Sequence, residues 1–260
     1  MKTTACFFAL AALIIVVNPC ARAQGTISTI AGNGTYYYPG NGGTALNAIL
    51  KSPGALATDT NGNIFFVDAG TVRKINTAGI ITNVAGGGST YPGDGGPATA
   101  ASLGYINNIC LDNQGNIYTT EQYNARVRKI NIATGIITTI AGTGTESYNA
   151  YNGEGGPATA ASLGNPKGLA ADKFGNIYVA DNINRVVRKI TAATGIITTI
   201  AGDTSSMALS IDSVAATNSA LFSLNDVKLD STGNLYLLAG DKIRRVDPAT
   251  GIIYTVTTVN

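Results

Sequence analysis

An internal repeat constrains the fold of this 260-residue chain more than any other feature. Four copies of a turn sequence each place Gly-Asn three residues after an Asp, and they begin at Asp59, Asp112, Asp172 and Asp230. The spacings between the copies are 53, 60 and 58 residues. Periods of this length indicate one supersecondary unit repeated along the chain, whose copies bury their apolar faces against one another. The sequence therefore predicts a repeat architecture.

Each turn is followed by two short strand patterns. A basic strand comes first, at 72–75, 127–130, 187–190 and 243–246, and an Ile/Thr-rich strand follows, at 81–84, 137–140, 197–200 and 253–256. β-Branched residues favour short pleated strands, while Asp and Gly-Asn favour the tight turns between them. Each unit is therefore predicted to be a four-stranded antiparallel meander. A related strand pattern at 27–30 precedes the first unit.

Longer glycine-rich loops join the units, and two of them, 91–103 and 151–163, are nearly identical. Pro97 and Pro157 fit the first turn of a short helix rich in Ala. A four-stranded sheet repeated every 50–60 residues and joined by such loops is a propeller blade. We predict an all-β propeller with an opening strand at 26–31 and blades at about 54–86, 105–142, 167–202 and 225–260.

Several sequence strings resemble the NHL-repeat β-propellers of secreted bacterial proteins. These strings are GDGGPA at 93–98, GNIYVAD at 175–181, RVRK at 126–129 and ITTIAG at 137–142. The resemblance covers roughly residues 26–260 and implies a radial propeller, usually of five or six blades. The chain departs from the pattern in three ways. Val186 stands where the second unit has Arg126, the first and fourth units have shortened second turns, and the loop at 207–216 lacks glycine.

The number of units conflicts with a simple closed ring. In a closed ring the opening strand would complete the last blade, yet residues 252–259 already supply that blade with a fourth strand. Two arrangements stay open: an incomplete ring, as in a truncated longer propeller, or an unusual closed ring of four blades. The extra strand favours the incomplete ring, which would leave unpaired edges and apolar blade faces exposed.

The first 23 residues match a secretory signal peptide. Lys2 gives the positive start, residues 5–17 form an apolar run, and Ala21-Arg22-Ala23 offers a cleavage site. The run has 13 residues, which is short for crossing a bilayer. We therefore expect a mature domain at 24–260 that is secreted, periplasmic or at the cell surface, with no membrane span after cleavage.

Cleavage would leave a nearly neutral chain. The 17 basic residues fall to 15, because Lys2 and Arg22 leave, and the 15 acidic residues are unchanged. A net charge near zero gives no long-range attraction to nucleic acid, so we expect no nucleic-acid partner. Cys110 remains alone in an apolar strand pattern, which indicates a small buried hydrophobe rather than a nucleophile.

Tyrosines and acids in the inter-blade loops are the candidate binding residues, since propeller loops commonly bind partners. A Tyr beside polar groups can stack on a sugar ring or anchor a peptide. The candidates are Tyr36, Tyr37, Tyr38, Tyr91, Asp94, Tyr148, Tyr151 and Glu154. Those that recur in phase would equally serve blade packing and loop N–H groups. Tyr36, Tyr37 and Tyr148 break the phase and are the stronger contact candidates.

The other repeated polar features have architectural interpretations. The dibasic pairs, which begin at Arg73, Arg128, Arg188 and Arg244, are expected to cover the blades with their stems while their charged heads lie in water. A phosphate or RNA site is the alternative, which the near-neutral charge disfavours. The Asp turns superficially resemble calcium loops but lack the further ligands, so we predict no metal and no cofactor.

An enzyme would need a base, a nucleophile or a metal. The chain has no His, which excludes Ser-His-Asp and Cys-His chemistry and disfavours zinc. The propeller lyases that this fold resembles use His and a divalent metal. Asp94 and Glu154 could serve a carboxylate-dependent lyase or glycosidase, but they belong to separate blades. We predict an exported, noncatalytic scaffold that binds protein or glycan through its inter-blade loops. The alternatives are that enzyme and a module of a larger surface protein.

Overall fold

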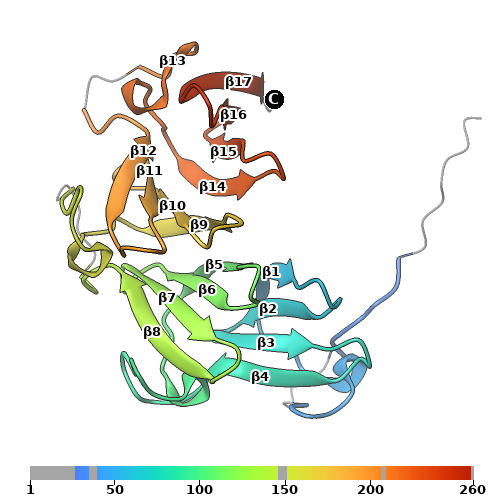
Figure 1. Ribbon diagram of the computed structural model, residues 1–260. Coiled ribbons are helices and arrows are strands. Elements are labelled where there is room, and N and C mark those ends of the chain that lie inside the picture. The colour runs from blue at the N-terminus through green and yellow to red at the C-terminus, as the bar shows by residue number, and fades with distance from the viewer. Residues whose placement is uncertain (1–26, 35–39, 146–150, 206–208, 259–260) are drawn as a thin grey trace, which may run out of the picture.

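Four antiparallel meanders follow one another along an arc in the computed structural model, which describes residues 27–34, 40–145, 151–205 and 209–258 (Figure 1). We call them blades 1 to 4 in chain order. Blades 1 and 2 comprise β1 (Pro53–Thr58), β2 (Ile64–Asp68), β3 (Thr71–Ile75) and β4 (Ile81–Gly86), then β5 (Ile106–Leu111), β6 (Ile117–Glu121), β7 (Arg126–Asn131) and β8 (Ile136–Ala141). Blades 3 and 4 comprise β9 (Pro166–Ala171), β10 (Ile177–Asp181), β11 (Val186–Ile190) and β12 (Ile197–Ala201), then β14 (Leu224–Leu229), β15 (Leu235–Ala239), β16 (Lys242–Val246) and β17 (Ile252–Thr258). The predicted all-β fold with four four-stranded blades is confirmed.

The loop before each blade returns to the outer strand of that blade. Pro97 pairs with Ile136 of β8, and Pro157 pairs with Ile196 beside β12. Before blade 4 the same pairing is longer and forms a two-residue strand, β13 (Val214–Ala215), on β17. A single 3-10 turn follows in each loop: η1 (Ala45–Asn47), η2 (Ala98–Ala100), η3 (Ala158–Ala160) and η4 (Ala216–Asn218). These turns are the short Ala-rich helices expected after Pro97 and Pro157.

The hydrophobic core lies between neighbouring blades rather than within any one of them. Phe65 and Val67 of blade 1 share a buried cluster with Ile109 of blade 2, and Ala180 of blade 3 shares one with Val227 of blade 4. A single meander is only one sheet thick, so each blade must bury its apolar residues against the next. This stacking gives the arc its cohesion.

The inner strands of successive blades pack directly on one another: β1 on β5, β5 on β9, and β9 on β14. The approach is closest at Gly168 of β9, where an added Cβ would lie 2.5 Å from the Cα of Asp226 in β14. Among the described strands, no comparable contact joins β14 back to β1. In Figure 1, blades 1 and 4 are the two ends of an arc that the described chain does not close.

The opening strand predicted at 26–31 is wrong for its described part, because residues 27–31 form no strand. Ile27 is fully exposed and Ile30 is 56% exposed. Blade 4 already has β17 as its fourth strand, and the outer edge of β17 pairs with β13. The position that an opening strand would take in a closed ring is therefore filled by the chain's own last strand.

Candidate functional site

The meander separates two kinds of loop onto two faces of the arc. The inter-blade loops and the turns between the second and third strands lie at one end of each blade, which we call the loop face. The Asp-x-x-Gly-Asn turns and the turns before the outer strands lie at the other end, which we call the hairpin face. Both faces follow from the antiparallel strand order of each blade.

The structure places four of the predicted binding residues, Tyr91, Asp94, Tyr151 and Glu154, in inter-blade loops on the loop face. The other four, Tyr36, Tyr37, Tyr38 and Tyr148, lie outside the described residues. The four described residues do not form one site. Instead, each Tyr and acid belongs to the polar network of the blade that follows its loop.

In blade 2 the network centres on Arg128, whose side chain is fully buried. Its Nη1 donates to Glu121 at 2.9 Å, and its Nη2 donates to Asp94 at 2.8 Å and to the carbonyl of Pro92 at 2.7 Å. The Glu121 side chain is also completely buried, whereas that of Asp94 is 39% exposed. Arg128 therefore neutralises a buried acid of its own blade and fastens the preceding loop to it.

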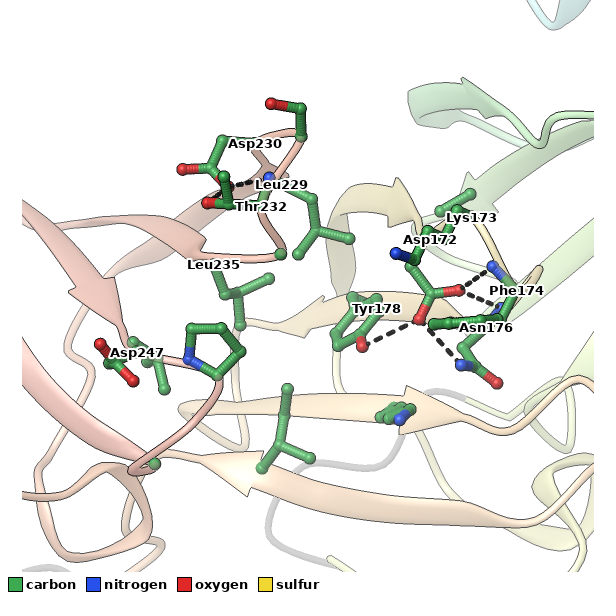
Figure 2. Close-up of a pocket in the computed structure, with 18 residues that line it drawn as sticks. Asp172, Lys173, Phe174, Asn176, Tyr178, Leu229, Asp230, Thr232, Leu235 and Asp247 are labelled. Carbon is green, nitrogen blue, oxygen red and sulfur yellow. Dashed lines mark hydrogen bonds between the residues drawn. The ribbon is translucent and has the colours of Figure 1, made fainter.

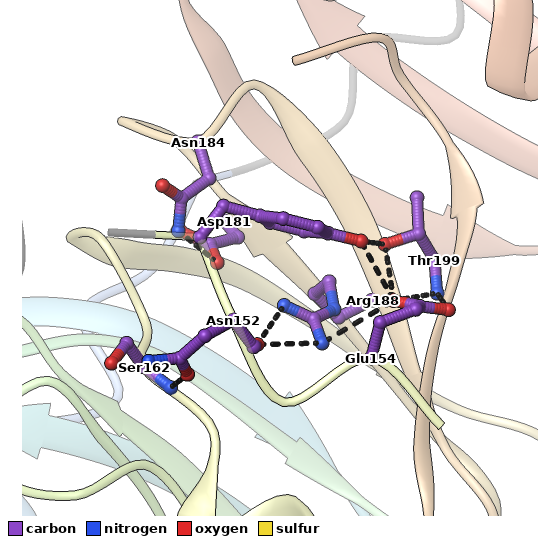
Figure 3. A network of polar contacts seen from close by, with 8 residues as sticks. Asn152, Glu154, Ser162, Asp181, Asn184, Arg188 and Thr199 are labelled. Atoms are coloured by element: carbon purple, nitrogen blue, oxygen red, sulfur yellow. Dashed lines mark hydrogen bonds and ion pairs between the residues drawn. The ribbon is translucent and has the colours of Figure 1, made fainter. Parts of the chain in front are cut away.

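In blade 3 the corresponding arginine is Arg188, also fully buried (Figure 3). Its guanidinium lies 4.7 Å from the ring centre of Tyr151, 3.5 Å from Glu154 and 3.4 Å from the carbonyl oxygen of Asn152. The Tyr151 hydroxyl donates to Glu154 at 2.7 Å, and the backbone N–H of Thr199 donates to the same carboxylate at 2.8 Å. Tyr151 and Glu154 thus bind the loop to β12 and cover the arginine.

These contacts set the ionisation of two carboxyl groups in blade 3. Burial alone would raise the pKa of Glu154, but hydrogen bonds from Tyr151 and Thr199 and the charge of Arg188 hold that pKa below its usual range. Asp181 is more deeply buried, and burial raises its pKa to about 6. Hydrogen bonds from Asn184 and from the N–H of Gly164 oppose this rise without cancelling it.

In blade 4, Arg244 repeats the arrangement with a different set of partners. It donates to Asp212 at 2.6 Å, to the carbonyl of Ile211, and to the hydroxyls of Ser210 and Ser219. Glu121 ends the second strand of blade 2, and Asp181 ends that of blade 3. The equivalent residue of blade 4 is Ala239, so this blade has no buried acid there. The arginine instead pairs with the loop acid Asp212 and with neutral loop groups.

The expectation that the dibasic heads lie in water is wrong for the arginines that open the pairs. Arg128, Arg188 and Arg244 are buried, because acids and carbonyl groups of the preceding loop desolvate and pair with them. The second members lie over aromatic rings instead: Lys74 over Phe65, Lys129 over Tyr118, Lys189 over Tyr178 and Arg245 over Tyr254. The dibasic pairs are therefore part of the blade architecture.

An exposed aromatic pair on the loop face was missed by sequence reasoning. Tyr105 and Tyr123 are 61% and 64% exposed, and their ring centres lie 5.9 Å apart with an angle of 54° between the rings. The equivalent positions of blade 3 hold Asn165 and Ile183, so the pair departs from the repeat. Comparison of the units position by position would have revealed it.

A further exposed aromatic lies in the inter-blade loop that precedes blade 2. Tyr91 is 49% exposed, and the guanidinium of Arg126 lies 5.3 Å from its ring centre and donates to its hydroxyl. Arg126 begins the strand that follows the turn carrying Tyr123. The same end of blade 2 therefore presents several aromatic rings with polar groups beside them.

The hairpin face carries the turns that the sequence predicted. In each turn the Asp carboxylate accepts the N–H two residues later; in blade 3, Asp172 also accepts the N–H and side-chain amide of Asn176 and the hydroxyl of Tyr178. All of these bonds lie within one hairpin. Turn chemistry therefore accounts for the repeated form of the four turns.

A groove of about 780 Å³ opens between blades 3 and 4 on this face (Figure 2). Its apolar wall comes from Tyr178, Ile200, Leu229 and Leu235, and the turns around Asp172, Asp230 and Asp247 form its polar border. Hydrogen bonds within the turns hold the pKa of Asp230 and Asp247 below the usual range. The groove is a second candidate surface that the sequence did not indicate.

Neither face presents a grouping of metal ligands in the described residues. No cluster of three or more His, Cys, Asp or Glu side chains in this part of the chain could hold a metal ion. The helices within the described ranges also lack the length and apolar character needed to span a bilayer.

Comparison with known proteins places the chain among NHL-type propellers. The sequence profile described as "Teneurin NHL domain" matches residues 24–92 and 144–213. Teneurin-1 of Gallus gallus is 32% identical over 206 residues, which cover 72% of this chain and 7% of that protein. Teneurin-4 of Mus musculus is 30% identical over 204 residues, with the same coverage. The chain thus spans a small part of the length of these relatives.

Solved structures show the same fold at lower sequence identity. A structural genomics protein from Bacteroides thetaiotaomicron superposes with a TM-score of 0.54 at 20% identity, covering 72% of this chain and 44% of that one. An auxiliary nutrient binding protein from Bacteroides ovatus superposes with a TM-score of 0.52 at 14% identity, covering 82% and 50%. At these identities the similarity establishes the fold alone.

Proposed function

The chain belongs to the Teneurin NHL domain family, and on this basis we propose that it is an exported, noncatalytic β-propeller scaffold that binds a protein or a glycan through its loop face. Export is supported by the signal-peptide pattern of residues 1–23. The partners of the much longer relatives are not transferred, because this chain matches only 7% of their length.

The observation that carries the proposal is the exposed pair of Tyr105 and Tyr123. The two rings, with centres 5.9 Å apart, expose apolar surface to water. The repeat does not account for them, because the equivalent positions of blade 3 are not aromatic. Large exposed aromatic groups next to polar rims are typical of recognition surfaces. The pair gives a ligand two ring faces and two hydroxyl groups.

The ligand class follows from the chemistry of this end of blade 2. Tyrosine rings stack on the apolar faces of sugars and on peptide side chains, and their hydroxyls bond polar groups at the edge. Tyr91 and Arg126 add a further ring and a cation. A neutral glycan or an extended peptide with apolar side chains fits this combination.

The geometry of the loop acids favours binding over catalysis. Asp94 accepts a hydrogen bond from Arg128, and Glu154 forms an ion pair with Arg188 at 3.5 Å, so each carboxylate is paired with the arginine of the blade that follows its loop. A general acid needs a raised pKa, whereas that of Glu154 is lowered. The variants Asp94→Asn and Glu154→Gln should therefore change the stability of the loops without abolishing any turnover.

The proposal is tested by binding of the purified chain to a printed array of oligosaccharides and to a displayed library of random peptides. For the best probe, the double variant Tyr105→Ala/Tyr123→Ala should weaken binding by about 30-fold or more, as removal of a central aromatic contact does. Phe174→Ala is the matched control, since Phe174 is 73% exposed but lies on the hairpin face. Equal affinity for the double variant and the wild type, or binding to neither set of probes, would contradict the proposal.

A further inference from the structure

The two ends of the arc expose residues that every internal blade boundary buries. Three residues before the turn Asp, the inner strands of blades 2, 3 and 4 carry Ile109, Leu169 and Val227, all at most 2% exposed. The equivalent residue of blade 1 is Leu56, which is 66% exposed. Leu56 has the same apolar character as its equivalents but lacks the preceding blade that would cover it.

The opposite end of the arc shows the complementary departure. On the face that each blade turns toward the next, blades 1 to 3 carry Val67, Thr120 and Ala180, all at most 5% exposed. The equivalent residue of blade 4 is Leu238, which is 39% exposed. On β17 of the same blade, Tyr254 is 36% exposed and Val256 is 54% exposed.

These two exposed surfaces are the two halves of one repeated interface. At an internal boundary, Val67 of one blade and Ile109 of the next lie in the same buried cluster, as do Ala180 and Val227. By the same repeat positions, Leu238 would meet Leu56. The trailing face of blade 4 is thus matched to the leading face of blade 1, and a single chain presents both.

We propose that a second copy of this chain covers both surfaces, with blade 4 of each copy packed on blade 1 of the other. Two such head-to-tail contacts, related by a two-fold axis, would close a ring of eight blades. Eight blades is within the range of four to eight found among propellers in general, although it exceeds the five or six usual for the NHL type. A head-to-tail contact forms a ring when its rotation closes, and closure would bury the exposed faces of both copies.

The decisive measurement is the molar mass of the purified chain by size-exclusion chromatography with multi-angle light scattering. The wild type should have twice the mass of one chain, and Leu56→Lys and Leu238→Lys should each halve it. Mixing the two variants should restore dimers, because the intact blade 4 of the first can still pack on the intact blade 1 of the second. A contact between two identical faces would not show this complementation.

Phe174→Lys provides the control, because Phe174 is 73% exposed, more than either Leu56 or Leu238, but lies on a middle blade. It should keep the dimer mass, and circular dichroism should show that all three variants retain their β-structure. A wild type with the mass of one chain at all concentrations would overturn the proposal. So would open polymers of increasing mass, or dimers that persist in Leu56→Lys.

Discussion

Arg128→Met should destabilise the protein strongly, because it leaves the buried Glu121 carboxylate without a cationic partner, with hydrogen bonds only from the Asn124 side-chain amide and the Gly104 N–H. Glu121 is completely buried, and its carboxylate lies 2.9 Å from the Arg128 guanidinium. Removal of one member of a buried ion pair costs about 3–5 kcal/mol. Asp94 adds little to this cost, since its side chain is 39% exposed and water can solvate it. For a domain of this size the change corresponds to a fall in melting temperature of roughly 6–20 °C.

Blade 4 supplies the matched comparison, Arg244→Met. Arg244 is as buried as Arg128, but Ala239 stands where blade 2 has Glu121. Its loss removes the Arg244 donor from neutral groups such as the Ser210 hydroxyl, and it leaves an Asp212 side chain that is 43% exposed. Unsatisfied neutral groups cost about 1–3 kcal/mol. Arg128→Met should therefore be the more damaging change by about 2 kcal/mol.

The assay is thermal and guanidinium unfolding followed by circular dichroism, with a double variant to isolate the buried charge. Glu121→Gln in the Arg128→Met background should recover about 2 kcal/mol, because a neutral amide replaces the unpaired carboxylate. A loss of unfolding free energy in Arg128→Met that is no larger than the loss in Arg244→Met would contradict this prediction. The prediction is also refuted if Glu121→Gln makes the double variant less stable than Arg128→Met alone.

Three further outcomes are expected. Since burial raises the pKa of Asp181 to about 6 from an unfolded value near ~4, the native state holds its extra proton between these values. Stability from this group is complete below pH ~4 and falls as the pH rises to about 6, so the wild type should lose roughly 3 kcal/mol relative to Asp181→Asn across that window in pH-dependent melting curves. Gly168→Ala should lower stability by about 1–3 kcal/mol, because its Cβ would overlap the backbone of β14, whereas Gly54→Ala should change the melting temperature little, because its Cβ would make an ordinary contact with the Val67 Cβ at 3.9 Å. Burial raises the pKa of the Cys110 thiol to about 12, so iodoacetamide should modify Cys110, detected by peptide mass spectrometry, only after unfolding.

The fold could be predicted because its turns are fixed by local chemistry repeated four times. In blade 2, the Asp112 carboxylate accepts the N–H groups of Gln114 and Asn116, two and four residues later. Such bonds depend only on neighbouring residues, so a sequence pattern is enough to identify them. The same local reasoning predicted the 3-10 turns that follow Pro97 and Pro157.

The burial of the arginines could not be predicted in this way. Arg128 is desolvated by Asp94 and Pro92, which lie 34 and 36 residues earlier in the chain. A charged side chain in a strand is ordinarily expected to reach water, and only the folded loop shows that its partners are in place. The prediction of an opening strand was wrong for a similar reason. Whether such a strand can join blade 4 depends on whether β17 already occupies the edge of that blade.

The repeat itself distinguishes two kinds of exposed apolar residue. Leu56 keeps the apolar character that its equivalents need at a blade boundary, so its exposure reflects a neighbouring blade that the described residues do not provide. Tyr105 belongs to blade 2, which has a neighbouring blade on each side, so its exposure does not come from a missing blade. It also departs from the repeat, since the equivalent residue of blade 3 is Asn165. At the ends of the arc an in-phase exposed residue therefore indicates assembly, whereas on the loop face an out-of-phase one indicates recognition. On this argument Leu56→Lys should change the mass of the particle and not its ligand affinity, and Tyr105→Ala should do the reverse.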